Sequence, residues 1–266
     1  KKWRAFFTPD MAAPFPSKDH LHRLWKSAPL PLPSLEDIGF RPTDLQAPPT
    51  TLSEEILKNY SETRDIPSIV GTSRMSTHLR FGTVSVRELV RRSLRSSPKY
   101  MNELVWREFF MQILWHFPNP EKAFKPAYDN IEWRHDEAAF KAWCAGRTGY
   151  PLVDAGMREL AATGLMHNRV RMVVASFLTK HLLLDWRLGE AWFAAKLLDF
   201  ELSSNNGGWQ WASGSGCDAA PYFRVFNPRL QLEKFDPQLR YVKKWVPEYG
   251  SANYVQPMVV HEMARQ

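Results

Sequence analysis

Residues 198–226 have the sequence LDFELSSNNGGWQWASGSGCDAAPYFRVF, and the rest of the chain is best understood from this stretch. Its first residues are typical of the end of a helix, which Asn205, Asn206, Gly207 and Gly208 should break, because asparagine and glycine accept left-handed backbone angles cheaply. A second loop of small residues is expected over 212–220. Single residues here could be ordinary packing, but the cluster of amides, carboxylates and indoles predicts a site for a flat, polar ligand.

Composition limits the possible functions. The 266 residues can bury a substantial core, in one large domain or two small ones. A net charge of +7 and a pI near 9.4 favour a polyanionic partner, nucleic acid or an acidic surface. Only Cys144 and Cys217 are present, so we expect no disulfide framework and a reducing compartment. We expect no membrane span, no signal peptide and no metal site.

The chain divides into three expected parts. Residues 1–51 contain nine of the twenty prolines, which predicts an extended connector that docks on a surface through short aromatic patches. Residues 52–247 have helical patterns almost throughout, and residues 248–266 form a C-terminal tail. The chain begins without methionine in this linker-like sequence, so we expect it to be part of a longer protein.

Two segments follow the linker. Residues 52–60 predict an amphipathic helix that Ser53 opens, and residues 64–67 should end it. Residues 71–76, GTSRMS, then place hydroxyl groups and an arginine directly before another helix. Such groups can hold phosphate, but hydroxyl residues at this position more often cap the helix, and we favour capping by about two to one.

Residues 102–117, NELVWREFFMQILWHF, predict a helix that is apolar almost all round and therefore buried. Glu103, Trp106 and Arg107 share one face because they are three and four residues apart. A buried carboxylate needs a partner, and Arg107 is expected to supply it. This pair is either a structural ion pair or a polar floor beneath a ligand.

The next helices predict a cavity wall. We expect a loop at 146–154, a helix at 155–162 that ends near Gly164, and a longer helix at about 166–184. In the longer helix, Asn168, Arg171 and Met172 lie opposite an apolar stripe that must face the core. Methionine and asparagine are unusual on an open helical surface, so this second face should line a cavity.

In their order along the chain, these motifs resemble the photolyase/cryptochrome family. They are residues 72–76 (TSRMS), 102–109 (NELVWREF), 149–151 (GYP), 166–172 (MHNRVRM), 205–211 (NNGGWQW), 218–224 (DAAPYFR) and 226–228 (FNP). The resemblance covers roughly residues 50–247 and is greatest to bacterial class I cyclobutane pyrimidine dimer photolyases. It implies an all-α, multi-helical FAD-binding domain after an interdomain linker, without the family's N-terminal α/β antenna domain.

The resemblance also implies an activity. Family members bind a U-shaped FAD non-covalently, and its excited anionic hydroquinone gives an electron to a flipped-out pyrimidine dimer, which splits. The implied partners are UV-damaged DNA and the antenna domain of the full-length protein, whose pigment should not bind to this chain. A monomeric, cytoplasmic bacterial enzyme at the nucleoid is expected.

By matching positions, the resemblance implies one set of residues around FAD. Asn205 would face flavin N5, where an amide favours repair over signalling. Tyr100 replaces a tryptophan of many relatives, and Glu201 replaces an aspartate, which would shift one hydrogen bond to the flavin or ribose. A buried pair between Arg171 and Asp199 is expected beside the ring. The implied cofactor-binding residues are Tyr60, Thr72, Ser73, Arg74, Met75, Ser76, Tyr100, Arg107, Arg171, Asp199, Glu201 and Asn205.

Further residues are implied for the lesion and for electron transfer. Glu103 and Asn168 would bond to base edges, Trp106 and Trp211 would stack on the bases, and Met172 would touch them. An electron relay to the flavin would use Trp133, Trp186 and Trp209, each of which could otherwise be a core aromatic residue. Contacts to DNA or the pocket rim are implied for Arg64, Glu103, Trp106, Asn168, Arg169, Trp211, Arg224 and Gln231.

Three alternatives remain. A (6-4) photolyase should have a histidine pair near the lesion, whereas here Asn168 follows His167 and Met172 occupies the later turn. A cryptochrome-type blue-light receptor shares the fold, but Asn205 disfavours it. A non-catalytic DNA-binding helical domain would explain the charge without the asparagine, glycine and tryptophan cluster.

Overall fold

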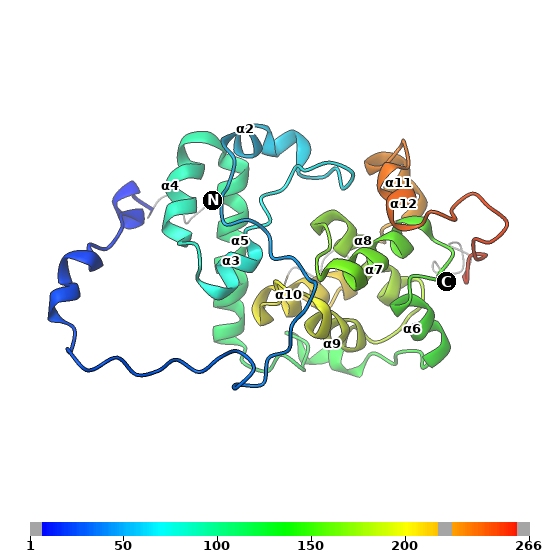
Figure 1. The fold of residues 1–266 in the computed structure, drawn as a ribbon. Coiled ribbons are helices and arrows are strands. Elements are labelled where there is room, and N and C mark those ends of the chain that lie inside the picture. The colour runs from blue at the N-terminus through cyan, green and yellow to red at the C-terminus, as the bar shows by residue number, and fades with distance from the viewer. Residues whose placement is uncertain (1–6, 218–224, 260–266) are drawn as a thin grey trace.

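The computed structural model describes residues 7–217 and 225–259, and it is helical (Figure 1). Within these residues there is no strand, only one isolated bridge between Arg134 and Leu184. Among them, no helix is both long enough and apolar enough to cross a bilayer. The α-helices are α2 Glu54–Thr63, α3 Ser76–Phe81, α4 Val86–Ser96, α5 Pro98–His116, α6 Glu137–Cys144, α7 Pro151–Thr163, α8 Asn168–Lys180, α9 Trp186–Lys196, α10 Leu202–Ser213, α11 Pro228–Phe235 and α12 Arg240–Trp245. The 3₁₀ helices are η1 Pro9–Ala12, η2 Ser17–Arg23 and η3 Pro126–Asn130.

The described helices enclose two hydrophobic cores. The larger, here called the large core, joins side chains of α6 to α12 around Trp143 and Phe177, which are fully buried. The smaller, here called the small core, joins α2, α4 and α5 around Leu57 and Leu89. The fold therefore has a boundary between two apolar units, and that boundary is where a ligand pocket is expected in helical folds.

Helix α10 joins the two cores. It packs against α8 and α9 on one side and against α5 on the other, between the two groups of helices in Figure 1. At Gly207 the α5 contact is so close that a Cβ atom would lie 2.2 Å from Cδ1 of Phe110. Only glycine lets the two helices approach this closely.

The expected break at residues 205–208 is wrong. Helix α10 continues through both asparagines and both glycines to Ser213, and its C-cap is Gly214, whose φ of 86° is left-handed. Its start is fixed by Glu201, whose side chain accepts hydrogen bonds from the backbone N–H groups of Ser203 and Ser204. The cost of glycine in a helix is offset by the packing against Phe110 that Gly207 permits.

Two helix limits also differ from the expectation. Helix α7 begins at Pro151 rather than at residue 155, because proline is favoured in the first turn, where its missing N–H group has no partner to lose. Helix α8 ends at Lys180 rather than near residue 184. Leu183 has a φ of 57°, and its carbonyl accepts the N–H group of Arg134, so the chain leaves the helix to pair with another segment.

Helix α5 is not buried, contrary to the prediction from its apolar composition. Only Tyr100, Met101 and Leu104 are buried in it, whereas Trp106 is 50% exposed and Trp115 is 81% exposed. The reason is that α5 lies at the edge of the small core and contributes one face to it. Its remaining aromatic side chains face outward or towards α10 and the cavity described below.

Segments near both ends of the described chain contact the helices, although part of the N-terminal segment is exposed. Arg91 donates to the carbonyl of Ala12 at 2.7 Å, so the first part of the linker is docked on α4, while Trp25 is 92% exposed. Near the C-terminus, the hydroxyl of Tyr254 donates to Oδ2 of Asp154, a fully buried carboxylate, at 2.7 Å. The division into linker, helical domain and tail remains a prediction.

The close contact predicts opposite effects of alanine at two adjacent glycines. Gly207→Ala should lower the free energy of unfolding by about 1–3 kcal/mol, because Phe110 must move. Gly208→Ala should raise it by about 0.5–1 kcal/mol, because a Cβ there has no atom within 4 Å and alanine favours the helix. Urea unfolding of both variants measures the difference, and equal stabilities would contradict the role assigned to Gly207.

Candidate ligand-binding cavity

A cavity of about 770 Å³ lies between the two cores. Its walls come from α2, α3, α5, α7, α8, α9 and α10 and from the segments that precede α3, α8 and α10. It is lined by every residue predicted to bind the cofactor: Tyr60, Thr72, Ser73, Arg74, Met75, Ser76, Tyr100, Arg107, Arg171, Asp199, Glu201 and Asn205. It is also lined by the residues predicted to contact the lesion and by one relay residue: Glu103, Trp106, Asn168, Met172, Trp211 and Trp209.

The TSRMS motif forms a turn in the cavity wall. Arg74 has a φ of 52° and Met75 follows in the right-handed region, a combination that is found in turns that bind anions. The preferred capping interpretation is wrong, because Met75 is the N-cap of α3 and no side chain caps it. The hydroxyl of Ser73 accepts hydrogen bonds from the N–H group of Met75 at 3.3 Å and from the hydroxyl of Tyr100 at 3.1 Å.

The expected pair of Arg171 and Asp199 is present in the cavity wall. Nη2 of Arg171 donates to both carboxylate oxygens of Asp199, at 3.0 and 2.9 Å, and its Nε donates to the carbonyl of Met166 at 2.8 Å. Asp199 is only 8% exposed. Burial raises its pKa, but the charge of Arg171 and a hydrogen bond from Ser76 outweigh this, so the net pKa is lowered. Asp199 is therefore ionised at neutral pH.

Asn205 is oriented by a partner that the sequence did not indicate. Its Nδ2 donates to the backbone carbonyl of Glu190 at 3.1 Å and to Oε1 of Glu190 at 2.8 Å. Because both partners are oxygen atoms, only the NH₂ end of the amide can face them. The side-chain oxygen of Asn205 is consequently the group that it offers to the cavity. Burial raises the pKa of Glu190, and the hydrogen bond from Asn205 opposes this.

Glu201 caps the start of α10, whereas the sequence predicted only a contact to the ligand. Its Oε1 accepts from the N–H group of Ser203, and its Oε2 accepts from the N–H group and the hydroxyl of Ser204 at 3.0 and 2.8 Å. Burial raises its pKa, but these hydrogen bonds outweigh burial and lower it. The carboxylate is thus engaged at the start of α10. Glutamate is not among the residues preferred at the N-cap, so the sequence carried no strong signal for this role.

The predicted partner of Glu103 is wrong. Glu103 pairs with Nη1 of Arg64, which comes from the end of α2, and not with Arg107 on its own helix. Arg107 instead donates to the carbonyl of Leu79 at 3.3 Å. The reason is that α2 packs against α5 and places its last side chains beside Glu103, so a partner from another helix replaces the one a turn away.

Aromatic side chains form two walls of the cavity. On α5, the rings of Trp106 and Phe109 meet edge to face with centroids 5.3 Å apart. On α10, Trp211 lies 6.0 Å from Phe226 at a tilt of 36°. Met172 on α8 lies between polar and apolar groups, with its sulfur 4.0 Å from Nδ2 of Asn168. The cavity therefore offers flat apolar faces together with an amide and a carboxylate.

Of the three tryptophans in the predicted relay, Trp186 and Trp209 lie in the large core, and Trp133 is partly buried against it. Trp186 and Trp209 are each 2% exposed. A Cβ at Gly189, three residues after Trp186 on α9, would lie 2.1 Å from the Trp209 ring. The bridge between Arg134 and Leu184 places the segment after Trp133 beside the segment before Trp186. Their role in electron transfer stays a prediction.

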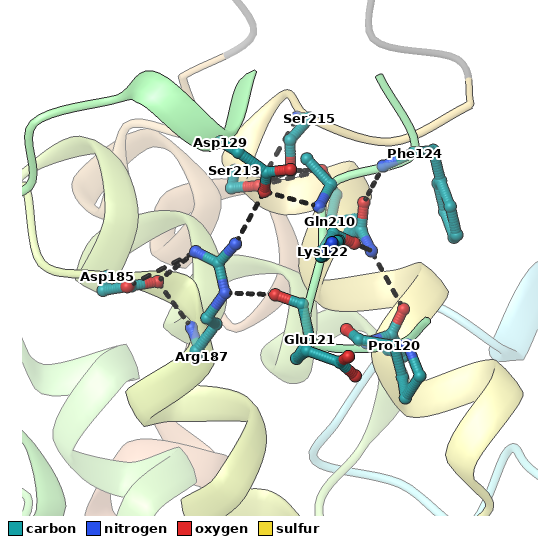
Figure 2. A network of polar contacts seen from close by, with 12 residues as sticks. Pro120, Glu121, Lys122, Phe124, Asp129, Asp185, Arg187, Gln210, Ser213 and Ser215 are labelled. Carbon is teal, nitrogen blue, oxygen red and sulfur yellow. Dashed lines mark hydrogen bonds and ion pairs between the residues drawn. The ribbon is translucent and has the colours of Figure 1, made fainter. Parts of the chain in front are cut away.

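Two amides of the NNGGWQW motif serve the protein's own backbone. Nδ2 of Asn206 donates to the carbonyl of Pro120 at 2.6 Å, and Gln210 accepts from the N–H group of Phe124 and donates to the carbonyl of Lys122, each at 3.0 Å. Figure 2 shows this network, in which Arg187 binds the same segment from α9. These amides hold the connection between α5 and α6, so only part of the motif faces the cavity.

The predicted DNA-contacting residues divide into three groups. Glu103, Trp106, Asn168 and Trp211 line the cavity, as described above. Arg64, Arg169 and Gln231 lie outside its lining, and Nη2 of Arg169 donates to Oδ1 of Asp65 at 2.9 Å. Arg224 lies outside the described residues. Contact with DNA stays a prediction for all of them.

His167 also lines the cavity, although the sequence did not mark it as a site residue. Its Nδ1 accepts the N–H group of Arg169 at 3.2 Å and so caps α8, while its Nε2 is buried without a partner among the described residues. Burial lowers the pKa of His167 to about 4, since the attraction of Asp65 is outweighed by burial and by Arg171, Arg169 and Arg64. The imidazole is neutral at pH 7.

This pKa predicts an acid-sensitive stability. The folded pKa lies below the unfolded value of about 6.5, so the unfolded chain binds the proton more readily. The stability of the neutral form is complete above pH 6.5 and decreases as the pH falls towards 4, by up to about 3 kcal/mol. His167→Asn keeps an N-cap and removes this titration, so its free energy of unfolding should change less over that interval. His116→Asn, at an exposed position, is the control, and parallel pH curves for all three proteins would contradict the assignment.

Comparison with known proteins shows which family the chain belongs to. A family model described as the FAD binding domain of DNA photolyase matches residues 100–266. Relatives named deoxyribodipyrimidine photo-lyase include those of Agrobacterium fabrum, 51% identical over 72% of this chain, and Escherichia coli, 45% identical over 76%. The chain spans 42% and 45% of those two relatives, respectively.

Solved structures give the same result. A class III photolyase from Agrobacterium tumefaciens matches with a TM-score of 0.75 and 45% identity, and a cryptochrome from Synechocystis matches with a TM-score of 0.72 and 35% identity. Each match covers 79% of this chain and 51% of the other chain, so the all-α fold expected from the motifs is confirmed. The chain therefore belongs to the family of FAD-binding domains of DNA photolyases.

Proposed function

We propose that the cavity binds FAD and that the chain is the catalytic part of a photolyase that repairs cyclobutane pyrimidine dimers in DNA. The observation that carries the proposal is that one cavity brings two sets of groups together. One part combines an anion-binding turn, a buried Arg171–Asp199 pair and the oriented amide of Asn205. Another part combines two aromatic walls with the side chains of Glu103 and Asn168.

The residues present fit FAD. The volume of about 770 Å³ lies within the range of roughly 300–1,000 Å³ that is usual for cofactor sites. The turn at residues 72–76 would hold the diphosphate, and Arg171 and Asp199 would hold the polar edge of the ring. Bound as the anionic hydroquinone, FAD supplies the light-driven electron for cleavage of the dimer.

Each residue of the cavity has a definable task around that chemistry. Arg171 offers positive charge to the ring, and its ion pair with Asp199 keeps the guanidinium in place. Asn205 offers a hydrogen-bond acceptor, because Glu190 holds its amide nitrogen. Tyr100, which is 4% exposed, closes the wall beside Ser73 and keeps water out.

On the substrate side, the residues suit two linked pyrimidine bases of one strand that have flipped out of the DNA duplex. Trp106 and Trp211 would stack against the two bases, a contact worth about 1–3 kcal/mol per base. Glu103 and Asn168 would bond to the base edges and Met172 would contact their faces. Electrons would pass from the surface to oxidised flavin through Trp133, Trp186 and Trp209. Two observations support this relay: the bridge between Arg134 and Leu184, and the close packing of Gly189 against the ring of Trp209.

Two related functions are less well supported. Asn168 and Met172 occupy the positions where a (6-4) photolyase should have its histidine pair, and both line the cavity. A cryptochrome-type receptor has the same fold, but the oriented amide of Asn205 favours repair. Membership of class I, the antenna pigment and domain, the monomeric state and a location at the bacterial nucleoid are further parts of this proposal.

The proposal is tested with the purified chain. It should bind FAD, with a flavin absorption spectrum, and under blue light with a reductant it should remove thymine dimers from an oligonucleotide. The same mixture in the dark is the control. A chain that binds no flavin, or that removes dimers equally in the dark, would contradict the proposal.

The aromatic wall is tested by two tryptophans on the same helix. Trp106→Ala should weaken binding to dimer-containing DNA by 1–3 kcal/mol, or about 5- to 150-fold, because one stacking face is lost, and should leave the FAD content unchanged. Trp115→Ala removes an 81% exposed indole outside the cavity lining and should change neither property. Loss of FAD with retained lesion affinity in Trp106→Ala would show that this wall belongs to the cofactor. Equilibrium binding in the dark and flavin absorption measure the two effects.

A further inference from the structure

Four charged side chains form a chain of ion pairs beside the cavity, here called the charged bridge: Glu103, Arg64, Asp65 and Arg169. Glu103 on α5 pairs with Arg64 at the end of α2. Nε of Arg64 lies 3.7 Å from Oδ1 of Asp65, and Nη2 of Arg169 on α8 donates to the same oxygen at 2.9 Å. The charged bridge therefore crosses from the small core to the large core.

Asp65 is the member that joins the two sides. The arginine side chains are 14% and 19% exposed, whereas that of Asp65 is 36% exposed. Arg169 lies over the ring of Phe235 at 4.4 Å, and its Nε is buried without a partner among the described residues. A cation in such a place depends on its carboxylate, because removal of one member of a buried pair leaves an uncompensated charge.

The position of the charged bridge matters for the cavity. Glu103 is one of its members, and Asn168 directly precedes another member, Arg169, on α8. Both Glu103 and Asn168 line the cavity, and they come from helices on opposite sides of the boundary between the cores. Groups that recognise a base must be held to within about 0.5 Å, so whatever fixes α2 and α5 against α8 fixes their separation.

The charged bridge also controls two positive charges. While Asp65 and Glu103 engage Arg64 and Arg169, these guanidinium groups are less available to DNA phosphates. Contacts to phosphate depend neither on the DNA sequence nor on whether the bases are damaged. Arginines released here would therefore strengthen binding to undamaged DNA. If these phosphate contacts are restrained, the protein discriminates better between dimer-containing and undamaged DNA, although it gains no contact to the dimer.

We propose, on the basis of the function proposed above, that Asp65 is a positioning residue for lesion recognition. It sets the separation of Glu103 and Asn168 through the two arginines, and it holds those arginines back from undamaged DNA. The property that it determines is the ratio of affinities for dimer-containing and undamaged DNA.

The test compares Asp65→Asn with the wild-type chain, both with flavin bound and in the dark. Dissociation constants are measured for an oligonucleotide with one thymine dimer and for the undamaged oligonucleotide, over a series of salt concentrations. Asp65→Asn should lower the affinity ratio at least tenfold. For undamaged DNA, its plot of log affinity against log salt should steepen by about one, because an arginine becomes available to phosphate. Asp65→Glu, which keeps the charge, should recover part of the ratio.

Asp129→Asn is the matched control. Oδ1 of Asp129 also accepts from an arginine, Nη2 of Arg187, at 2.9 Å, and this pair lies outside the cavity lining, in the network of Figure 2. The variant removes the same charge, so an equal change in both variants would reduce the effect to net charge and overturn the proposal.

Other outcomes are equally decisive. An unchanged affinity ratio in Asp65→Asn would overturn the proposal, as would a parallel loss of both affinities with a lowered unfolding midpoint, which would mark a purely structural residue. If the wild-type chain itself showed no preference for the dimer, the proposed function would fail, and the positioning role with it. A retained wild-type preference with no effect of Asp65→Asn would refute only the positioning role.

Discussion

The close approach of α5 and α10 is the contact on which the rest of the structure depends. Between Gly207 on α10 and the ring of Phe110 on α5 there is no room for even one methyl group. This contact holds the small core against the large core, and the cavity lies along the boundary. A wider separation would move Glu103 on α5 away from Asn168 and Asn205, so the spacing of the polar groups across the cavity rests on it.

The polar groups of the cavity are held by partners within the protein. Arg171 is fixed by Asp199, the nitrogen of Asn205 by Glu190, and Glu103 by Arg64. Because these partners are already in place, little reorganisation is needed when a charged or hydrogen-bonding ligand enters. The consequence is that each oriented group must keep its partner, so Asp199, Glu190 and Arg64 are as important as the groups that they hold.

Much of the cavity could be predicted from the sequence, and the misses have a common cause. The ordered motifs located the cavity residues. Helical periodicity predicted that Asn168, Arg171 and Met172 face a cavity and that the opposite, apolar stripe faces the core, where Val173 is fully buried. Local patterns failed where a distant segment decides. Phe110 explains why the helix continues through Gly207, and α2 explains why Arg64 replaces Arg107 beside Glu103. Neither contact leaves a signal in the neighbouring sequence.

A ligand that spans the boundary acts as a thermodynamic cross-link between the two cores. The cavity has walls from both apolar units. A ligand that contacts both walls therefore adds its binding free energy to the free energy needed to separate the two units. Without it, the small core has fewer buried side chains to resist opening and can separate at a lower free energy than the large core. Cofactor occupancy thereby governs whether the chain behaves as one cooperative unit or as two.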